Sequence, residues 1–352
     1  LLLFRCCFVL CFFGVLALFL FFKLITSFAL YGFPESHSAS FALIAYASSY
    51  LKCHFPAAFL AGLLNAWPMG FYNPATLVKD AQRHGVTVRP IDVARSAWKC
   101  TLEDARTVRI GLRHASGLRA GSGLRIERTR AARAFDSLGD FVRRADLRRD
   151  ELDTLAELQA LASLPGAPRK RRAAMWQVAG IERDAASLFA GEAPAQHPDA
   201  ADETRDAHAL PVPEMSGVEA TLADYRLAGL TTGPQIMAHL RQRLRARGVL
   251  SAAELRDAPN GRWVRIAGHV IVRQRPGPAK GICFVTLEDE TGTANAVLMP
   301  EEFQRFRAPL HQAPIVEIAG PVQNVDRVIH VRAREIWPLG VHGELPRSHD
   351  YR

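Results

Sequence analysis

The chain has 352 residues, enough for two or three domains, and its 44 lysines and arginines against 35 acidic residues give a formal net charge of +9. The six cysteines contain no CxxC pair, and the twelve histidines contain no HExxH or HxH cluster, so the sequence indicates neither a zinc site nor a disulfide framework. The basic balance favours an anionic partner such as nucleic acid, although clustered arginine can also reflect a GC-rich genome and solvated helix faces.

Residues 1–26 differ from the rest of the chain. Between residues 1 and 22 the only charged side chain is Arg5, and at a rise of about 1.5 Å per residue this run could cross most of a bilayer. One interpretation is a signal anchor or transmembrane helix, which would make a membrane a partner. Because the chain does not begin with methionine, we favour a frameshifted or chimeric reading frame and leave the leader out of the fold argument.

Two helices are predicted next. After Pro34 and Ser36, apolar residues recur at helical spacing until Pro56 ends the first helix, and a second apolar helix covers residues 57–66 before turn residues at 67–70. A purely structural pair of helices would not require the polar residues Tyr31, Ser36, His37 and Lys52. The structural alternative is that Ser36 only caps the helix and that the other polar side chains are solvated.

The middle of the chain mixes short strands, glycines and arginines. Residues 85–90 indicate a strand, 98–110 a strand pair, and 111–164 a glycine-rich hairpin followed by short helices. Glycines at 117, 121 and 123 would let backbone N–H groups approach an anion. Ser137 with Asp140 is typical of a helix start at residue 138, and Asp150 of one at residue 151. Residues 106–149 hold twelve arginines against four acidic residues, and RKRR follows at 169–172.

The last part of the chain predicts a linker and then a β domain. Residues 191–215 are rich in Ala, Pro, Asp and Glu and should form a flexible linker, and 216–260 a helical lead-in. Apolar residues alternate with Arg265, Ala267, His269, Ile271 and Arg273 along residues 264–272. Further strands are expected at 282–287, 294–298, 315–318 and 328–336, with a helix at 301–307. Five strands with a helix between the third and fourth describe an OB-fold barrel at 261–340, before a tail at 341–352.

Four segments resemble the bacterial C-family DNA polymerases, and within them the error-prone polymerase related to the polymerase III alpha subunit. They are YGFPESHSASFALIAYASSYLKCHFPAAFLAGLLN at 31–65, MGFYNPATLVKDAQRHGV at 69–86, FDSLGDFVRR at 135–144 and VRIAGHVIVRQRPGPAKGICFVTLEDETGTANAVLMP at 264–300. The resemblance implies an α+β multidomain chain: a helical fingers remnant at 27–105, a helix-hairpin-helix DNA-binding module at 106–190, and then the linker, lead-in and OB-fold.

The resemblance also implies site residues. Tyr31, Ser36, His37 and Lys52 match positions near the incoming nucleotide. Phosphate contacts to duplex DNA would come from the helix-hairpin-helix module through Arg113, Arg119, Arg125, Arg128 and Arg130. In the OB-fold, Arg273, Arg275 and Lys280 flank the first strand connection, and Phe284 offers a stacking surface for single-stranded template. The leucine-rich ending Leu158-Gln159-Ala160-Leu161 and the extra glycines depart from the family pattern and put the hairpin geometry in doubt.

The family's activity is DNA-directed DNA synthesis, a nucleotidyltransferase reaction, from dNTPs with Mg²⁺ in replication, translesion synthesis and DNA repair after damage. Its metal-binding carboxylates belong to a palm that this chain lacks. The resemblance therefore implies a cytoplasmic carboxy-terminal fragment that is inactive alone, has no catalytic residues, binds no cofactor of its own and works with primer-template DNA and other replication proteins. The alternative is a stand-alone DNA-binding accessory protein built from the last two modules.

Overall fold

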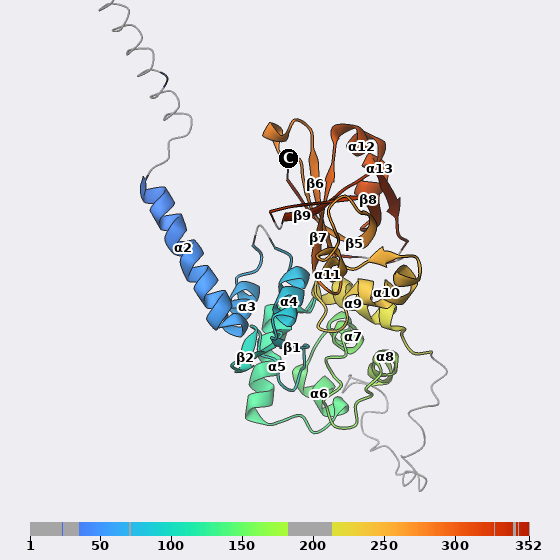
Figure 1. Cartoon of the computed structure of the whole chain (residues 1–352). Helices are drawn as coiled ribbons and strands as arrows, with labels where there is room; N and C mark the ends of the chain where they lie inside the picture. Colours follow the sequence, from blue (N-terminus) through green and yellow to red (C-terminus); the bar gives the residue numbers. More distant parts are fainter. Residues whose placement is uncertain are drawn as a thin grey trace, which may run out of the picture. The chain divides into compact units, whose positions relative to one another are not determined.

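The computed structural model describes residues 23, 35–69, 72–181, 213–326, 328–340, 343 and 345–351. The chain divides into two compact units, residues 1–55 and 56–352. The described part of the first unit is chiefly one helix, α2 (Glu35–His54), so the predicted helix ending before Pro56 is confirmed (Figure 1). The leader at 1–22 and residues 191–212 of the predicted linker lie outside the described residues. Among the described helices, none is both long and apolar enough to span a membrane.

The second unit begins with two helices and a small sheet. Helix α3 (Pro56–Asn65) is the second predicted helix, and α4 (Pro74–Arg83) starts at Asn73, whose side chain accepts a hydrogen bond from the Ala75 N–H at 3.0 Å. Strand β3 (Thr107–Arg109) pairs with β1 (Thr87–Arg89) in parallel and with β2 (Thr101–Asp104) antiparallel. These strands confirm the predicted strand at 85–90 and the strand pair at 98–110.

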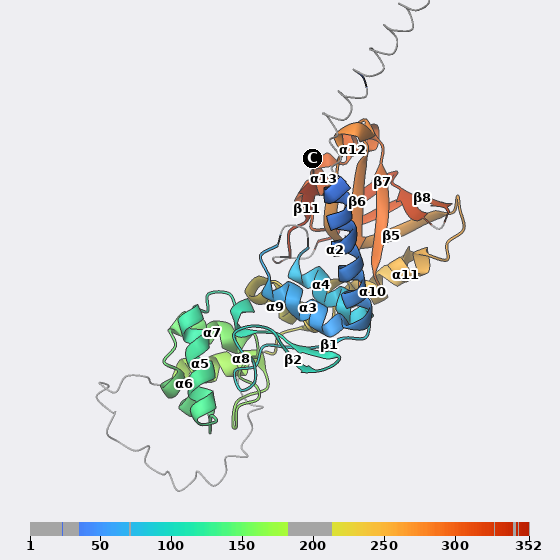
Figure 2. The same cartoon turned by 90° about the vertical axis from the view of Figure 1, so that its left-hand side faces the viewer.

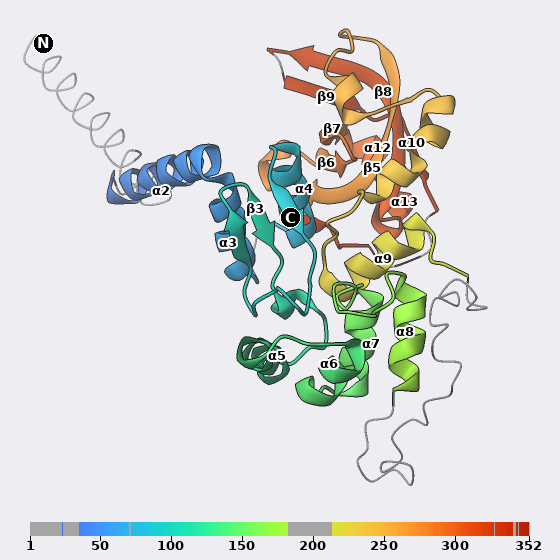
Figure 3. The ribbon, with the colours of Figure 1, turned by 90° about the horizontal axis from the view of Figure 1, so that it is seen from below.

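A helical module follows the small sheet. It contains the short 3₁₀ turn η1 (Leu112–His114), α5 (Ala120–Ala132), α6 (Leu138–Ala145), α7 (Arg149–Glu157) and α8 (Arg171–Gly180), and Figure 3 shows α7 and α8 side by side. Of the three glycines predicted to shape the connection, only Gly117 does so, with φ of +79°. The prediction was wrong for Gly121 and Gly123, which lie inside α5. Gly123 is needed there because a Cβ would lie 2.3 Å from the ring of Trp98.

The predicted helix starts are partly correct. Ser137 caps α6 by accepting a hydrogen bond from the Asp140 N–H at 3.1 Å, as predicted. The prediction for Asp150 was wrong, because α7 already begins at Arg149 and ends at Glu157. Glu151 performs the capping role instead, since its carboxylate accepts a hydrogen bond from the Arg148 N–H at 2.9 Å.

A helical lead-in connects this module to the terminal sheet. It consists of α9 (Gly217–Ala228), α10 (Ile236–Ala246), the short strand β4 (Val249–Leu250) and α11 (Ala252–Leu255). Ser216 caps α9 in a reciprocal pair with Glu219, and Gly229 ends that helix with φ of +67°. The lead-in therefore starts and stops at residues suited to helix ends.

The terminal sheet contains the predicted strands. They are β5 (Trp263–Gln274), β6 (Cys283–Glu288), β7 (Thr293–Leu298), β8 (Ile315–Val325), β9 (Val328–Arg332) and β10 (Glu335–Pro338), with α12 (Pro300–Arg305) and α13 (Arg307–Gln312) between β7 and β8. The single strand predicted at 328–336 is two strands, because β9 pairs with the far half of β8 and β10 with its near half. The predicted single helix at 301–307 is likewise two short helices.

Strand pairing closes this sheet into a circuit. Strand β5 pairs with β6 and β8, β6 with β7, β7 with β9, and β9 with β8; all are antiparallel except β7 with β9. Figure 2 shows β5, β6 and β7 as neighbours. This is the strand order of a five-stranded OB-fold, to which β10 and a parallel strand β11 (His349–Tyr351) in the tail are added.

Burial along β5 follows the predicted alternation only in part. Val264, Ile266 and Val270 are buried as predicted. Ala267 and His269, predicted to face outward, are buried too. The His269 ring is hydrogen bonded at 2.8 Å to the Pro346 carbonyl, and β11 pairs with the end of β5, so the chain's last segment covers this face of the strand.

Helix α4 is attached to the end of β6 by buried polar groups. Arg83 Nη2 donates to Glu288 Oε1 at 2.9 Å, and Thr76 donates to the other oxygen at 3.4 Å. Lys79 donates to the Gly233 carbonyl and, at 2.8 Å, to Gln82. Burial raises the pKa of Glu288 and lowers the pKa of Lys79 to about 8. Polar contacts therefore hold α4 against the terminal sheet, while Ala75, Val78 and Ala81 of the helix join the apolar core of the preceding modules.

Candidate nucleic-acid interface

The outer face of the terminal sheet carries an exposed aromatic ring. On β6, Cys283, Val285 and Leu287 point into the core, so the alternating residues Phe284 and Thr286 point outward. Phe284 is 39% exposed although it is a large apolar side chain in the middle of a sheet. An exposed ring in that position can stack against a nucleobase.

Strand register places further groups in the same row as this ring. Phe284 lies opposite Gln274 on β5 and Val297 on β7, and Val297 lies opposite Arg332 on β9. The row therefore runs from an amide through two apolar side chains to a guanidinium. Arg332 was not predicted as a site residue. The residue is half-buried, and its Nε is buried without a hydrogen bond to any described residue.

A second row of polar side chains lies beside the first. Thr286 on β6 donates a hydrogen bond to Asn295 on β7 at 2.9 Å. Gln323 on β8, which is exposed, and His330 on β9, which is half-buried, are hydrogen bonded at 2.7 Å. These groups give the face hydrogen-bonding partners for base edges and sugar around the aromatic ring.

The connection between β5 and β6 carries the basic side chains Arg275 and Lys280, and Arg273 lies near the end of β5. Lys280 is exposed and adopts a left-handed conformation with φ of +49°, and Arg275 lies 4.8 Å from the centre of the Phe303 ring. Arg273 is held at 3.4 Å from the Asp350 carboxylate and 3.2 Å from the His311 ring. Lys280 thus lies in the connection that leads into β6, Arg275 packs on the Phe303 ring, and Arg273 already has internal partners.

Cys283 precedes this ring but offers no reactive thiolate. Its side chain is buried, and burial raises the pKa of the thiol to about 11. The chemistry of this face is therefore binding through stacking, hydrogen bonds and charge.

The first hairpin of the helical module is organised around the Glu151 carboxylate. Arg119 donates to it from its backbone N–H at 3.0 Å and from two guanidinium nitrogens at 2.9 Å each. Ser122 Oγ donates at 3.1 Å, and the Arg148 N–H closes the set. Burial acts to raise the pKa of Glu151, but these hydrogen bonds outweigh it and lower the pKa to about 2. An internal anion thus occupies the start of α5.

The other arginines predicted to contact phosphate have internal partners as well, with one exception. Arg113 donates at 2.8 Å to the carbonyls of Asn65 and Trp67, and Arg130 donates to two carbonyls of the 93–96 turn. Arg125 lies 3.3 Å from the Asp146 carboxylate. Arg128 is exposed, and its only partner among the described residues is the Leu124 carbonyl, 3.3 Å from Nε. Arg128 is therefore the member of this set best placed to meet a phosphate.

The predicted nucleotide-binding residues are not brought together within the described chain. Tyr31 lies outside the described residues, and the Ser36 side chain is not described either. His37 and Lys52 are both exposed on α2, fifteen positions apart, which is about 22 Å at 1.5 Å per residue. The His37 ring instead lies 4.4 Å from the ring of Phe41, centre to centre.

Two family models match the chain. One is described as a helix-hairpin-helix motif and matches residues 85–174, and the other as an OB-fold nucleic acid binding domain and matches residues 261–339. The predicted order of a helix-hairpin-helix module followed by an OB-fold is confirmed.

Curated relatives match most of the chain. It is 46% identical over 338 residues to the error-prone DNA polymerase of Azoarcus sp. (strain BH72), covering 93% of this chain and 30% of the relative. It is 48% identical to that of Bordetella parapertussis and 42% identical to error-prone DNA polymerase 2 of Agrobacterium fabrum, in each case over 90% of this chain and 29% of the relative. The chain thus spans less than a third of these relatives. Among solved structures, asparaginyl-tRNA synthetase from Pyrococcus horikoshii aligns over 28% of this chain and 24% of that chain, with 22% identity and a TM-score of 0.24.

Proposed function

We propose that this chain, which belongs to the error-prone DNA polymerase family, corresponds to the carboxy-terminal part of these enzymes and binds their DNA substrate. It spans about 30% of the length of the relatives. The observation that carries the proposal is the outward row of Phe284, Val297 and Arg332 across three neighbouring strands, with Lys280 in the loop that precedes the first of them. A base would stack on Phe284 while Lys280 and Arg332 meet the flanking phosphates.

The helical module would add contacts to duplex DNA that do not read sequence. Arg128 is the exposed arginine of this module that we assign to phosphate, because its predicted neighbours already serve internal carbonyls and carboxylates. Contacts of this kind position a duplex without selecting a sequence, which suits an enzyme that must accept any template.

For the whole enzyme we propose template-directed DNA synthesis from dNTPs in replication, translesion synthesis and DNA repair, in the cytoplasm and with Mg²⁺. The names of the relatives support the polymerase activity. Among the described residues, no three acidic, histidine or cysteine side chains gather as metal ligands, and we assign Mg²⁺ to no residue of this chain. We propose that this chain does not extend a primer by itself. A primer-extension assay with dNTPs and Mg²⁺ tests this, and extension abolished by a substitution in this chain would refute it.

Stacking on Phe284 is tested by titrating labelled single-stranded DNA with the full chain. Phe284→Ala should weaken binding about tenfold, because stacking of one base on an aromatic ring is worth about 1–3 kcal/mol. Trp337→Ala is the matched control, since Trp337 is 38% exposed on β10 of the same domain but lies outside the row that contains Phe284. Equal losses in both variants, or no loss in Phe284→Ala, would reject the proposed surface.

A further inference from the structure

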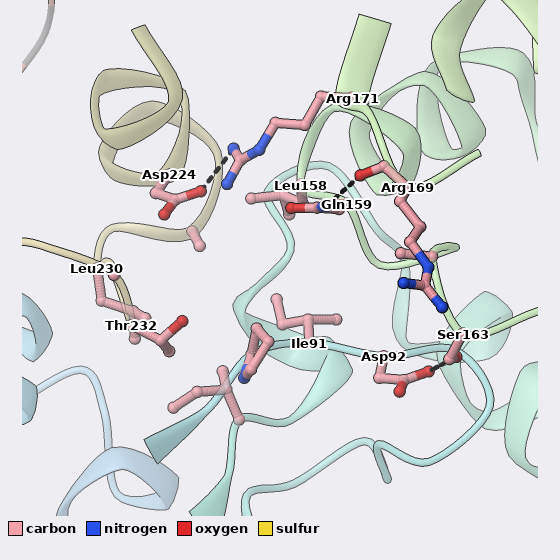
Figure 4. Close-up of a pocket in the computed structure, with 15 residues that line it drawn as sticks. Ile91, Asp92, Leu158, Gln159, Ser163, Arg169, Arg171, Asp224, Leu230 and Thr232 are labelled. Atoms are coloured by element: carbon pink, nitrogen blue, oxygen red, sulfur yellow. Dashed lines mark hydrogen bonds and ion pairs between the residues drawn. The ribbon is translucent and has the colours of Figure 1, made fainter. Parts of the chain in front are cut away.

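A cavity of about 590 Å³ lies between the helical module and the loop that follows α9 (Figure 4). Its walls come from the loop after β1, residues 158–163 after α7, residues 169–171 at the start of α8 and residues 228–233, together with Ile110 after β3 and Asp224 on α9. The volume falls within the range of about 300–1,000 Å³ that is usual for small-molecule sites, and such sites prefer the seams between modules.

One wall of the cavity is apolar. Ile91, Ile110, Leu158 and Leu230 line it, and each is buried. This wall would remove from water the apolar face of a compact organic ligand. Polar groups lie around it, including Gln159, Ser163 and Thr232.

Three of the charged groups in the lining, Arg171, Asp224 and Asp92, already have partners of opposite charge. Arg171 Nη1 lies 2.7 Å from the Asp224 carboxylate and also donates to the Ala220 carbonyl at 3.2 Å. Asp92 accepts a hydrogen bond from Ser163 Oγ at 2.5 Å and lies 3.8 Å from Arg109 Nη1. These pairs can hold the walls in place but contribute little net charge to a ligand.

Arg169 is different. In the RKRR sequence at 169–172, Lys170 pairs with Glu214, Arg171 with Asp224 and Arg172 with Glu219. The Arg169 guanidinium has no ion-pair or hydrogen-bond partner among the described residues, and Figure 4 places it over the side of the cavity that holds Asp92 and Ser163. Its main chain is fixed, because Gln159 Nε2 donates to the Arg169 carbonyl.

The residue that fixes Arg169 has an unusual backbone. Gln159 has φ of +61°, in the left-handed region that residues other than glycine rarely adopt. Strained residues of this kind are found preferentially at ligand sites, where the surrounding structure holds them in place. The unusual backbone of Gln159 thus occurs in the cavity lining, at the residue that supports Arg169, the one unpaired cation among the described lining residues.

We propose that this cavity binds a nucleoside monophosphate unit, with the base and sugar on the apolar wall and the phosphate at Arg169. A simple anion would make no use of the apolar wall, and a neutral apolar ligand would leave the guanidinium unpaired. One unpaired cation matches one phosphate, whereas a triphosphate would call for several. The unit can be a free nucleotide or a nucleotide turned out of a bound DNA strand, and the chemistry of recognition is the same for both.

The first test is calorimetric titration of the full chain with dAMP. Wild-type protein should bind saturably, Arg169→Ala should bind about tenfold more weakly because a charge-assisted hydrogen bond is lost, and Ala162→Trp, which fills the cavity, should abolish binding. Arg149→Ala is the control, because this arginine lies on the same module, outside the cavity lining, and pairs with Asp153. If Ala162→Trp does not fold, Arg169→Ala still tests the proposal, because Arg169 is exposed and its replacement should leave the fold intact.

The second test distinguishes the two sources. A primer-template carrying 2-aminopurine should become more fluorescent on binding if a base is turned out into the cavity, and the increase should vanish in Ala162→Trp. Binding of dAMP without a fluorescence change indicates a free nucleotide. The proposal is overturned if the wild-type protein shows neither dAMP binding nor a fluorescence increase. It is also overturned if one of these signals is unchanged in both Ala162→Trp and Arg169→Ala. The dAMP titration contains no DNA, so its result does not depend on whether Phe284 binds single-stranded DNA.

Discussion

Replacing Glu151 with glutamine should destabilise the helical module and remove part of its sensitivity to acid. The Glu151 side chain is buried and its pKa falls from an ordinary 4.5 to about 2, a difference worth about 3 kcal/mol at 1.36 kcal/mol per pH unit. Because its partner Arg119 is 45% exposed, solvent screens part of the interaction, and we expect a loss of about 2 kcal/mol at pH 7.

The sign of the pH dependence follows from the lowered pKa. The stabilisation is fully present above pH 4.5, the ordinary value, and is lost as pH falls toward 2, where the folded protein also binds the proton. Urea unfolding followed by circular dichroism between pH 7 and pH 2.5 measures it. Wild-type stability should fall more steeply below pH 4.5 than that of Glu151→Gln, and the two should converge at the acid end. Equal stability at pH 7 with parallel pH profiles would refute the assignment of Glu151 as the internal anion.

Three further predictions concern packing and charge. Gly123→Ala should destabilise the chain by about 1–3 kcal/mol because its Cβ would meet the Trp98 ring, whereas Gly121→Ala in the same helix meets nothing within 4 Å and should be neutral or stabilising in thermal melts. Val270→Asp should cost several kcal/mol by burying a carboxylate, and an unshifted cooperative melt would contradict the register of β5. Arg128→Ala should lower the slope of log affinity for duplex DNA against log salt by about one, and an unchanged slope would remove this arginine from the interface.

The elements of this fold were largely predictable because their signals are local. Period-two alternation of apolar residues predicted β5, and the spacing of Ser137 and Asp140 predicted the start of α6 from only four residues of sequence. The run at 328–336 misled because its division into β9 and β10 depends on which half of β8 each part pairs with, and that is a contact between distant segments. Gly123 misled in the same way, since its requirement comes from Trp98, which precedes the helix.

The roles of the arginines could not be predicted from their clustering. Arg113 donates to a carbonyl 48 residues earlier in the chain, and Arg130 to one 37 residues earlier, so only the folded chain shows that both are used internally. Phe284 was identified from its strand position, but Arg332 was not, because the row that joins them is created by the pairing of β6, β7 and β9. Sequence alone shows how much positive charge a module carries, whereas the fold decides how much of it is left for a ligand.

Helix α4 and the proposed stacking ring are connected through one strand, because Arg83 of α4 binds Glu288 at the end of β6 and Phe284 lies on the same strand. Glu288 is the last residue of β6 and Phe284 is its second, so the two are four positions, or about 13 Å, apart along the strand. Strand β6 is paired with β5 and β7 over that length, and we expect a displacement of α4 to reach Phe284 through it. By the reciprocity of coupled equilibria, a DNA strand seated on Phe284 would oppose movement of α4 with the same free energy.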